Sequence, residues 1–315
     1  MKKKIIKIII VGAGRISAEY LKILKKNSKI KVVGIVSRTQ KSSMIKAKKF
    51  KISEYGTSLN KMMNELKPDI AIVCVSPSET LKVCNKIFKF KCVSLIEKPL
   101  GLSLKETIYL TNLSKKYNHR LYVALNRRFY SSTQKLQKIL LNNKDKRIVT
   151  VFDQESKSNA LKSGHNNKVV KNWMFANSIH LIDYFNIFCR GNFKKISTES
   201  FKLGSNQKFL TSKIHYNSGD IGIYHAYWDR PAPWKVTVSC KKSFFTLSPI
   251  EKLMEKNYKG KLISYKEGEF DKKFKPGFFA MINSLINAYN NKSSKLPGVK
   301  ENLKTMKLIH NIYKK

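Results

Sequence analysis

The sequence contains few acidic residues and few arginines. Of its 315 residues, 20 are Asp or Glu and 63 are Lys or Arg, which gives a formal net charge of +43. Only eight of the basic residues are arginine, the side chain that makes bidentate contacts with phosphates and bases. The lysines are spread along the whole chain rather than gathered in one block. This distribution favours a solvated, lysine-rich surface over a nucleic-acid site, and the same charge would also steer anionic ligands such as nucleotide sugars.

No apolar run reaches the roughly 18 residues that span a bilayer, so we expect no membrane segment. The first residues, Met1 to Ile10, resemble a signal peptide because they are basic and then apolar. The apolar stretch continues directly into Gly12-Ala13-Gly14, however, without a convincing cleavage site. We interpret the segment as a first strand behind a basic tail.

The five cysteines are odd in number, and no two are spaced as Cys-x-x-Cys. Most lie in apolar runs, which is typical of buried thiols in a reducing cytoplasm rather than of a disulfide framework or a zinc site. No group of His, Cys, Asp and Glu has the spacing of metal ligands, so we predict no metal site. We expect a cytoplasmic protein.

Strand-like and helix-like segments alternate over the first 125 residues. Short β-branched runs are followed by stretches of helical periodicity, which predicts a doubly wound parallel sheet. The predicted strands are residues 5–11, 31–36, 70–75, 92–96 and 121–125. The first of these strands leads into the glycine-rich turn Gly12-Ala13-Gly14, which is typical of a Rossmann domain. We assign residues 1–122 to this domain.

The pattern changes in residues 123–315, which we assign to a second domain. Long strand-like runs follow one another with few helices between them, and Asn217-Ser218-Gly219-Asp220 has the composition of a hairpin turn. The segments 156–170 and 229–234 are interpreted as surface loops. These features predict an α+β domain with a largely antiparallel, open sheet. The predicted strands are 148–154, 195–201, 209–216, 220–228, 235–240 and 244–247, and the closing helices are 278–289 and 301–313.

A glycine motif follows the first predicted strand. Gly12 allows a tight turn out of the strand, and Gly14 lets backbone amides approach a pyrophosphate at the start of the next helix. The third glycine position of such motifs holds Ser17, a small residue. Because the motif lies between a buried strand and a helix, it predicts a dinucleotide-binding site.

The residues after the second strand report on the ribose of the cofactor. An acidic side chain there would bind the 2′-hydroxyl of NAD, but this sequence has Ser37-Arg38-Thr39. A guanidinium can pair with a 2′-phosphate, which predicts that NADP is tolerated or preferred. The alternative is that Arg38 stacks on the adenine and accepts either cofactor.

Two further segments contain candidate catalytic residues. Glu97-Lys98-Pro99 follows a parallel strand, at the edge where open α/β sheets bind ligands, and Lys98 could hold a substrate hydroxyl and relay its proton. The alternative is a surface lysine. In the segment 177–185, Asn177 and His180 lie on one helical face, which Asp183 continues. His180 suits acid–base chemistry, although a lone histidine on an apolar helix is more often a core residue.

Together these motifs resemble the glucose–fructose oxidoreductase/inositol dehydrogenase family (Gfo/Idh/MocA). The resemblance rests on Gly12-Ala13-Gly14-Arg15-Ile16, Glu97-Lys98-Pro99-Leu100, Asn126-Arg127-Arg128-Phe129 and Ser178-Ile179-His180-Leu181-Ile182-Asp183. It implies hydride exchange between a nicotinamide, NADP or NAD, and a secondary alcohol of a sugar, cyclitol or sugar derivative. It also implies a homo-oligomer, a dimer or a tetramer, assembled through the open sheet of the second domain.

The resemblance assigns roles to individual residues. Lys98 would bind or activate the reacting hydroxyl, His180 would be the acid–base catalyst, and the Lys98–Pro99 peptide would often be cis. Asn177 would position the substrate. The predicted cofactor-binding residues are Gly12, Gly14, Arg15, Ile16, Ser37, Arg38, Ser76, Pro77, Glu97, Lys98 and Arg128.

One position departs from the family pattern. Many members carry an aspartate four residues before the histidine, and this position holds Ala176 here. Asn177 can supply a polar contact but cannot act as a base. Two functions therefore stay open: an oxidoreductase acting on a small sugar-like substrate, and a nicotinamide-binding sensor or regulatory protein without turnover.

Overall fold

The computed structural model describes residues 5–205 and 207–314. Its internal contacts group the chain into two compact units. The first unit contains the chain up to Leu125 together with Phe278–Leu303, and the second contains Asn126–Gly277 and the chain from Lys304 onward. The basic tail predicted before the first strand, Lys2 to Lys4, lies outside the described residues.

Strands and helices alternate in the first unit, as predicted. Within the described residues its elements are β1 (Ile6–Val11), α1 (Arg15–Leu24), β2 (Ile30–Val36), α2 (Gln40–Phe50), β3 (Glu54–Gly56), α3 (Leu59–Leu66), β4 (Ile70–Val73), a 3₁₀ turn (Pro77–Glu79), α4 (Thr80–Ile87), β5 (Val93–Glu97), α5 (Leu104–Lys116), β6 (Arg120–Ala124), α11 (Phe278–Tyr289) and the start of α12 (Val299–Tyr313).

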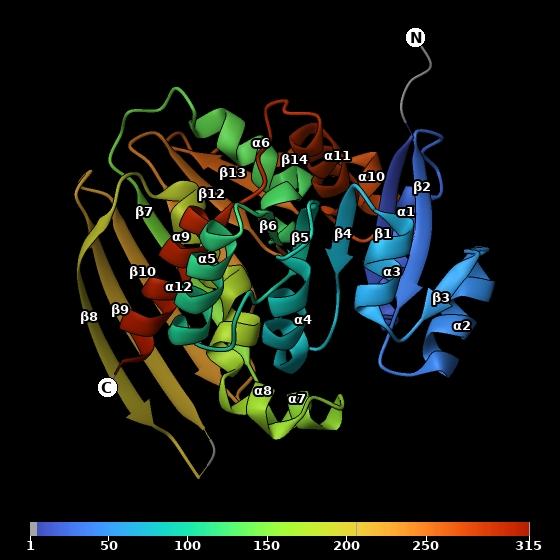
Figure 1. Ribbon diagram of the computed structural model, residues 1–315. Coiled ribbons are helices and arrows are strands. Elements are labelled where there is room, and N and C mark those ends of the chain that lie inside the picture. The colour runs from blue at the N-terminus through green and yellow to red at the C-terminus, as the bar shows by residue number, and fades with distance from the viewer. Residues whose placement is uncertain (1–4, 206, 315) are drawn as a thin grey trace. The chain divides into compact units, whose positions relative to one another are not determined.

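The strands of the first unit form one parallel sheet in the order β3-β2-β1-β4-β5-β6 (Figure 1). Ile8, Ile9 and Ile10 of β1 are fully buried, as expected for a strand covered on both faces. The strand order reverses between β1 and β4, and ligands bind such sheets beyond the carboxyl ends of the strands at this switch point. The predicted doubly wound parallel sheet is confirmed.

A segment from late in the sequence completes the first unit. Phe278 of α11 packs against Tyr20 of α1 with ring centroids 4.9 Å apart, and the hydroxyl of Tyr289 donates to Oδ1 of Asp69 over 2.7 Å. The sequence analysis assigned all of residues 123–315 to the second domain, whereas these contacts place 278–303 in the first. Helical periodicity predicts an apolar face but does not indicate which unit covers it.

The second unit contains a larger sheet and most of the remaining helices. Within the described residues its elements are a 3₁₀ turn (Asn126–Phe129), α6 (Ser131–Leu140), β7 (Ile148–Glu155), α7 (Lys157–Lys162), α8 (Asn167–Lys171), a π-helical turn (Met174–Ser178), α9 (Ile179–Phe188), β8 (Phe193–Lys202), β9 (Lys208–Tyr216), β10 (Ile221–Trp228), β11 (Lys235–Ser239), β12 (Ser243–Leu247), β13 (Leu253–Asn257), β14 (Leu262–Tyr265), α10 (Glu269–Lys273) and the end of α12.

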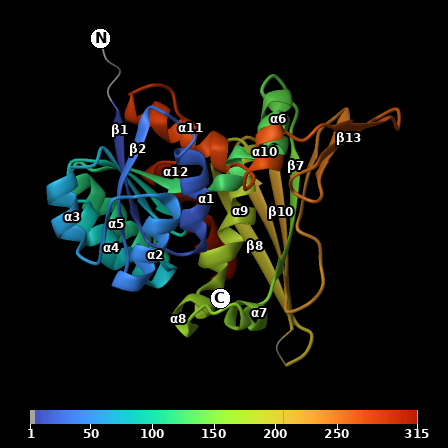
Figure 2. The same cartoon turned by 90° about the vertical axis from the view of Figure 1, so that its right-hand side faces the viewer.

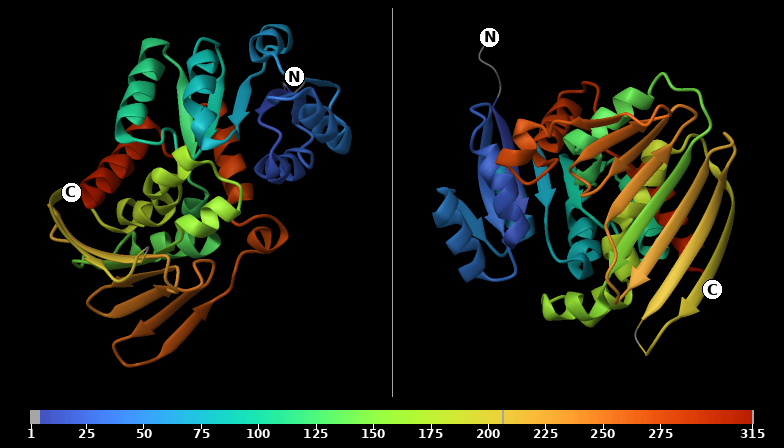
Figure 3. Two further views of the ribbon diagram at one scale, coloured as in Figure 1. Left: turned by 90° about the horizontal axis from the view of Figure 1, so that it is seen from below. Right: turned by 180° about the vertical axis from the view of Figure 1, so that it is seen from behind.

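The strands of the second unit are ordered β14-β13-β12-β11-β7-β10-β9-β8 (Figure 2). Within the described part of this sheet, β7 and β10 alone pair in parallel, so the predicted largely antiparallel sheet is confirmed. The predicted turn at Asn217–Asp220 joins β9 to β10, with Gly219 at a φ of +82° that favours glycine. The strands run side by side in the right-hand view of Figure 3.

Five helices and strands of the described second unit were not predicted: α7, α8, α10, β13 and β14. The segment interpreted as a loop at 156–170 contains α7 and most of α8, because the side chains of Ser156 and Asn166 cap their first backbone N–H groups. The strands β13 and β14 were not predicted. Lysines and other polar residues obscure their alternation, which is typical of strands at the edge of a sheet.

The two faces of the larger sheet differ in character. On one face, Val149 and Val151 of β7 and Tyr224 of β10 are fully buried, and α9 packs against β7 on this side (Figure 2). The opposite face carries a half-exposed aromatic cluster. Its members are Phe152, Phe201, Phe209, His225 and Tyr227, with ring centroids of neighbours 5.0–6.1 Å apart.

Among the described residues, no helix is long and apolar enough to cross a membrane, and no group of His, Cys, Asp or Glu side chains is arranged to hold a metal ion. All five cysteines are free thiols. Cys74, Cys84 and Cys189 are buried, and Cys92 and Cys240 are half-buried.

Candidate active site

The glycine turn after β1 has the geometry that a bound pyrophosphate needs. Gly12 has a φ of +113°, and a Cβ atom there would lie 2.4 Å from the carbonyl oxygen of Cys74. At Gly14, a Cβ atom would meet nothing within 4 Å, so the backbone is open to an approaching ligand. Ser17 is fully buried and donates a 2.7 Å hydrogen bond to the carbonyl oxygen of Gly14. A small hydroxyl side chain therefore takes the third glycine position and fixes the turn.

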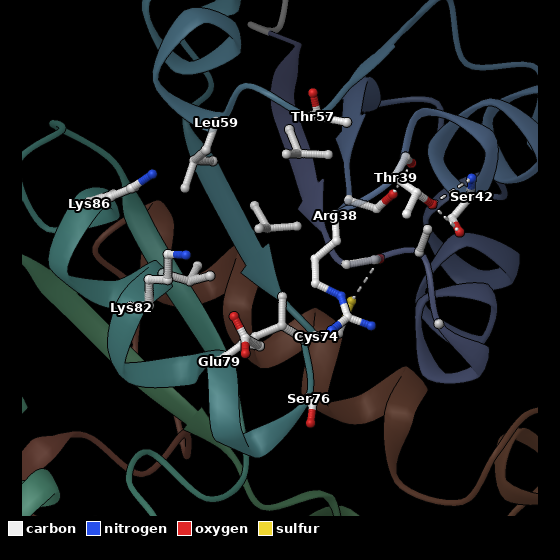
Figure 4. A pocket seen from close by; sticks show the side chains of 18 residues that line it. Arg38, Thr39, Ser42, Thr57, Leu59, Cys74, Ser76, Glu79, Lys82 and Lys86 are labelled. Atoms are coloured by element: carbon white, nitrogen blue, oxygen red, sulfur yellow. Dashed lines mark hydrogen bonds between the residues drawn. The ribbon is translucent and has the colours of Figure 1, made fainter. Parts of the chain in front are cut away.

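A pocket of about 690 Å³ opens beside this turn (Figure 4). The ends of β1, β2 and β4 surround it, as expected at the switch point of the sheet. It is lined by Val11, Gly12, Ala13, Gly14, Val36, Ser37, Arg38, Thr39, Ser42, Thr57, Leu59, Cys74, Val75, Ser76, Glu79, Lys82, Val83 and Lys86. The open cradle at Gly14 and the apolar walls fit a dinucleotide. We call it the dinucleotide pocket.

The structure brings five of the predicted cofactor-binding residues to this pocket. They are Gly12, Gly14, Ser37, Arg38 and Ser76. Sequence reasoning missed Glu79, the last residue of the 3₁₀ turn, and the residues contributed by α4, which are Lys82, Val83 and Lys86. Their signal was their position just after a strand that ends at the switch point.

Arg38 extends into the dinucleotide pocket from the end of β2 (Figure 4). Thr39 follows it as the N-cap of α2, where its side chain accepts from the backbone N–H of Ser42 over 3.3 Å. The first turn of α2 contains no acidic residue, so the positive end of the helix dipole is not offset there. This end of the pocket suits a negatively charged group.

The segment Glu97-Lys98-Pro99 lies at the same edge of the sheet. Val73 of β4 pairs with Ile96 of β5, so Glu97 at the end of β5 and Lys98 after it lie beside the residues that follow β4 and line the pocket. The Lys98–Pro99 peptide is cis, as the family resemblance implied. The hydroxyl of Tyr20 donates to Oε1 of Glu97 over 2.6 Å. Glu97 is thus held by the helix that follows the glycine turn, a role that the sequence analysis did not foresee.

The other predicted cofactor-binding residues lie outside the lining of the pocket. Arg15 and Ile16 begin α1, directly after Gly14, and Pro77 follows Ser76 in the 3₁₀ turn. Arg128 belongs to the second unit, where its Nε and Nη2 atoms each donate to Asp183 over 2.6 Å. Cofactor binding by these residues remains a prediction.

His180 and Asn177 lie where the π-helical turn meets α9. Asn177 is in the π-helical turn and half-buried, and His180 is the second residue of α9. Such π-helical turns are often found at functional sites. Asp183, three residues after His180, accepts from Arg128 and from the hydroxyl of Thr305 (2.8 Å). Its carboxylate therefore anchors α9.

A buried carboxyl pair lies under Asn177, and the sequence analysis missed it. Asp153 and Glu155 are 0% and 2% exposed and project from β7 on the same face. Glu155 accepts from the indole Nε1 of Trp173 (2.6 Å) and from Nδ2 of Asn177 (2.9 and 3.0 Å). Asp153 accepts from the hydroxyl of Tyr224 over 2.7 Å. The alternation of the strand could have revealed the pair, because both follow Val149 and Val151 on the buried face.

The two carboxyls are both buried and lie two residues apart on one face of β7, so the charge of one affects the other. Burial raises the pKa of Glu155 well above its ordinary value, and the neighbouring charge of Asp153 raises it further. Burial also raises the pKa of Asp153, although the Tyr224 hydroxyl opposes the shift. Burial and mutual repulsion therefore both disfavour ionisation of the two carboxyls together.

Comparison with known proteins agrees with this site. Residues 6–125 match the family model of the Gfo/Idh/MocA proteins, described as an oxidoreductase family with an NAD-binding Rossmann fold. This segment therefore carries the NAD-binding domain of that oxidoreductase family, as expected for an NAD(P)-dependent dehydrogenase. No curated protein matches the sequence.

Solved structures share the fold over nearly the whole chain. A dehydrogenase from Chromobacterium violaceum has a TM-score of 0.85 at 14% identity, covering 98% of this chain and 94% of its own. An oxidoreductase from Agrobacterium radiobacter, solved with NAD+, L-tartaric acid and magnesium, has a TM-score of 0.78 at 12% identity, with coverages of 98% and 95%. UDP-N-acetylglucosamine 3-dehydrogenase from Acidithiobacillus ferrooxidans has a TM-score of 0.79 at 12% identity, with coverages of 97% and 96%.

Proposed function

We propose that the protein transfers a hydride between a nicotinamide cofactor and a secondary alcohol or ketone of a sugar, cyclitol or nucleotide sugar. The observation that carries this proposal is the position of Lys98. It follows β5 directly, at the carboxyl edge where the residues after the neighbouring strand β4, which are Cys74, Val75 and Ser76, line the dinucleotide pocket. A cationic side chain at this edge can bind the oxygen of a substrate that lies against the nicotinamide.

The proposed chemistry assigns one role to each of three residues. A bound nicotinamide would supply the acceptor for the hydride of the carbon that bears the hydroxyl. Lys98 binds the reacting oxygen and stabilises the negative charge that develops as its proton leaves. His180 takes that proton in oxidation and returns it in reduction, and Asn177 positions the substrate through its amide.

The substrate class draws support from charge and from the fold. The formal charge of +43 favours the approach of anionic substrates, and nucleotide sugars are anionic. One protein with the same fold is named a UDP-N-acetylglucosamine 3-dehydrogenase. Its activity is a starting point for the substrate search.

We further propose that NADP is preferred over NAD. Arg38 faces the dinucleotide pocket, and neither Ser37 nor Thr39 provides a carboxylate for a ribose 2′-hydroxyl. The N-terminus of α2, capped by Thr39, adds backbone N–H groups for a 2′-phosphate. A cytoplasmic location is proposed because all five cysteines are free thiols.

The direct test is a screen for cofactor reduction against sugars, cyclitols and nucleotide sugars, with NADP and with NAD. We expect one class to be oxidised. The Lys98→Ala variant should lose about 10²–10⁴-fold in kcat while its dinucleotide Kd stays unchanged. Full turnover by this variant would remove Lys98 from the mechanism. A bound nicotinamide that no substrate oxidises or reduces would instead support the sensor function.

We also propose that the protein forms a homo-oligomer, a dimer or a tetramer, through the aromatic cluster on the open face of the larger sheet. Stacked rings that stay half-exposed in one chain are typical of surfaces that a second copy covers. Light scattering should give a mass of two or four chains. Replacing Phe209 with Lys should yield monomers, and a monomeric wild type would contradict the proposal.

A further inference from the structure

The carboxyl of Glu155 determines which way the amide of Asn177 points. Both oxygens of Glu155 lie within 3.0 Å of Nδ2 of Asn177. The same carboxyl accepts from the indole N–H of Trp173, and the hydroxyl of Ser178 lies 3.3 Å from Oε1. Because it is surrounded by donors, the carboxyl acts as an acceptor, and Asn177 must turn its NH₂ group toward it. The amide oxygen of Asn177 then lies on the opposite branch, directed away from Glu155.

Asn177 and His180 share one side of a continuous helical backbone. The π-helical turn ends at Ser178, and Ile179 has right-handed helical dihedrals (φ −48°, ψ −36°), so the chain passes into α9 without a break. Residues three apart on such a helix are neighbours on its surface. Asn177 and His180 are therefore neighbours on the surface of this helical segment.

We propose that Glu155 is a positioning residue of the candidate active site, which holds Asn177 with its amide oxygen toward the substrate so that it accepts a hydrogen bond from a substrate hydroxyl. This inference rests on the proposed function. It specifies the chemistry of the contact: the site selects a donor, such as a hydroxyl beside the reacting carbon. A substrate that offers only an acceptor at that place would leave the amide oxygen unpaired, which costs affinity.

The buried carboxyls of Asp153 and Glu155 suit this positioning role because their surroundings keep Glu155 a hydrogen-bond acceptor. Asp153 and Glu155 are buried and face donors, which are the hydroxyls of Tyr224 and Ser178 and the indole of Trp173. The carboxyl oxygens facing Asn177 therefore stay acceptors. A rigid, buried partner fixes the amide more firmly than water would.

The test exchanges the carboxyl of Glu155 and the amide of Asn177. Asn177→Asp alone places a third carboxyl against the pair and removes the N–H group that Glu155 holds, so kcat should fall about 10–100-fold. Adding Glu155→Gln places an amide at position 155, whose N–H can donate to the new carboxylate at position 177. The number of acidic residues is then the same as in wild type. The second carboxylate oxygen at position 177 is left directed at the substrate. This double variant should recover kcat to within a few-fold of wild type.

Two outcomes would overturn the proposal. One is that Asn177→Asp turns over as fast as wild type. The other is that Glu155→Gln adds its own loss to that of Asn177→Asp instead of reversing it, because independent roles give additive effects. Glu255→Gln is the matched control: Glu255 accepts from Ser243 and Tyr265 (both 2.6 Å) on β12 and β14, and its replacement should leave kcat unchanged.

A second measurement needs no turnover and separates this proposal from the proposed function. In the full chain labelled with ¹⁵N-asparagine, the side-chain NH₂ of Asn177 is identified by its loss in Asn177→Asp. We expect these signals to exchange slowly with solvent and to shift in Glu155→Gln but not in Glu255→Gln. Signals that exchange freely, or that ignore Glu155→Gln, would overturn the positioning role even if the enzyme is active. The expected shift without any substrate turnover would instead leave the positioning intact and count against the dehydrogenase function.

Discussion

The hydroxyl of Tyr20 donates a 2.6 Å hydrogen bond to Oε1 of Glu97, joining the helix after the glycine turn to the residue before Lys98. Tyr20 is fully buried, and its ring packs against Phe278. Burial raises the pKa of Tyr20 well above its ordinary value, and the charge of Glu97 adds to the shift. The phenol therefore stays protonated and remains a donor.

Tyr20→Phe should uncouple these two parts of the first unit. The ring packing is kept but Glu97 loses a donor, so the free energy of unfolding should fall by about 1–3 kcal/mol in urea titrations. Since Lys98 is the next residue, kcat should also fall, by about tenfold, with little change in dinucleotide Kd. Tyr109→Phe is the control, because Tyr109 donates to Asn85 (2.8 Å) at an exposed site. Equal effects of the two substitutions would mean that the Glu97 contact has no special role.

The two glycines of the turn should respond differently to alanine. In Gly12→Ala the new Cβ lies 2.4 Å from the carbonyl oxygen of Cys74, at a φ of +113° that disfavours L side chains. We expect a loss of more than about 2 kcal/mol in unfolding free energy.

Gly14→Ala has no such clash, because Gly14 has a φ of −70° and open space around the Cβ position. Its stability should change by less than about 1 kcal/mol. The added methyl lies on the surface that a pyrophosphate would approach, so the dinucleotide Kd should rise about tenfold or more. Unchanged dinucleotide binding in a folded Gly14→Ala variant would argue against the predicted position of the pyrophosphate.

Arg38→Ala tests the preference for NADP. Loss of a charge-assisted contact with the 2′-phosphate should weaken NADPH binding by about 10–100-fold, while NADH binding changes by less than about threefold. Isothermal titration with both cofactors measures this directly. Lys41→Ala removes a nearby charge on α2 that does not line the pocket, and it should weaken NADPH binding much less. A parallel loss for NADH would favour stacking of Arg38 on the adenine.

His119 should make stability depend on pH. Its Nδ1 lies 3.1 Å from the carbonyl oxygen of Phe90, which can only accept, so Nδ1 carries the proton and Nε2 accepts from Ser94 (2.8 Å). Burial lowers the pKa of His119 to about 4. Because the unfolded chain has its ordinary pKa of about 6.5, it binds this proton first as the pH falls. The contribution of neutral His119 to the free energy of unfolding is therefore fully present above about pH 6.5. It is lost progressively as the pH falls toward 4.

Urea titrations at pH 7 and pH 5 measure this effect. The neutral histidine should account for a loss of about 2 kcal/mol between these two values. His119→Gln keeps a donor and an acceptor without the titration, so its stability should fall less over the same interval. An identical pH dependence in the variant would assign the loss to other groups.

The parallel sheet could be predicted because its strands are buried on both faces. Continuous apolar runs such as Ile8–Val11 have no other stable place in a protein of this composition. The unit in which α11 packs could not be predicted, since its apolar face would suit either. The strand β13 was missed because Leu253 alone of its residues is buried.

The predicted site residues fall into two groups. The glycine turn and Arg38 were found because backbone geometry and helix position determine what they do. The partner of Arg128 was not found, because nothing near Arg128 in the sequence indicates that its guanidinium will pair with Asp183, 55 residues later. Glu155 was missed for a similar reason: alternation predicts that it is buried, but only the tertiary structure brings Trp173 and Asn177 to it.

The late segment that completes the first unit bears on how the chain is made. A ribosome delivers the whole parallel sheet early, yet Phe278 and Tyr289, which cover Tyr20 and Asp69, are synthesised more than 150 residues afterwards. The second unit also needs a late residue, since Tyr313 bonds to Tyr224 (2.9 Å). Neither unit can finish folding until these late residues have been made, so the nascent Rossmann half must remain incompletely covered while the roughly 150 residues between them are synthesised. Nascent chains of this architecture should therefore depend on chaperones that shield apolar helix faces, more than on rapid folding of the first domain.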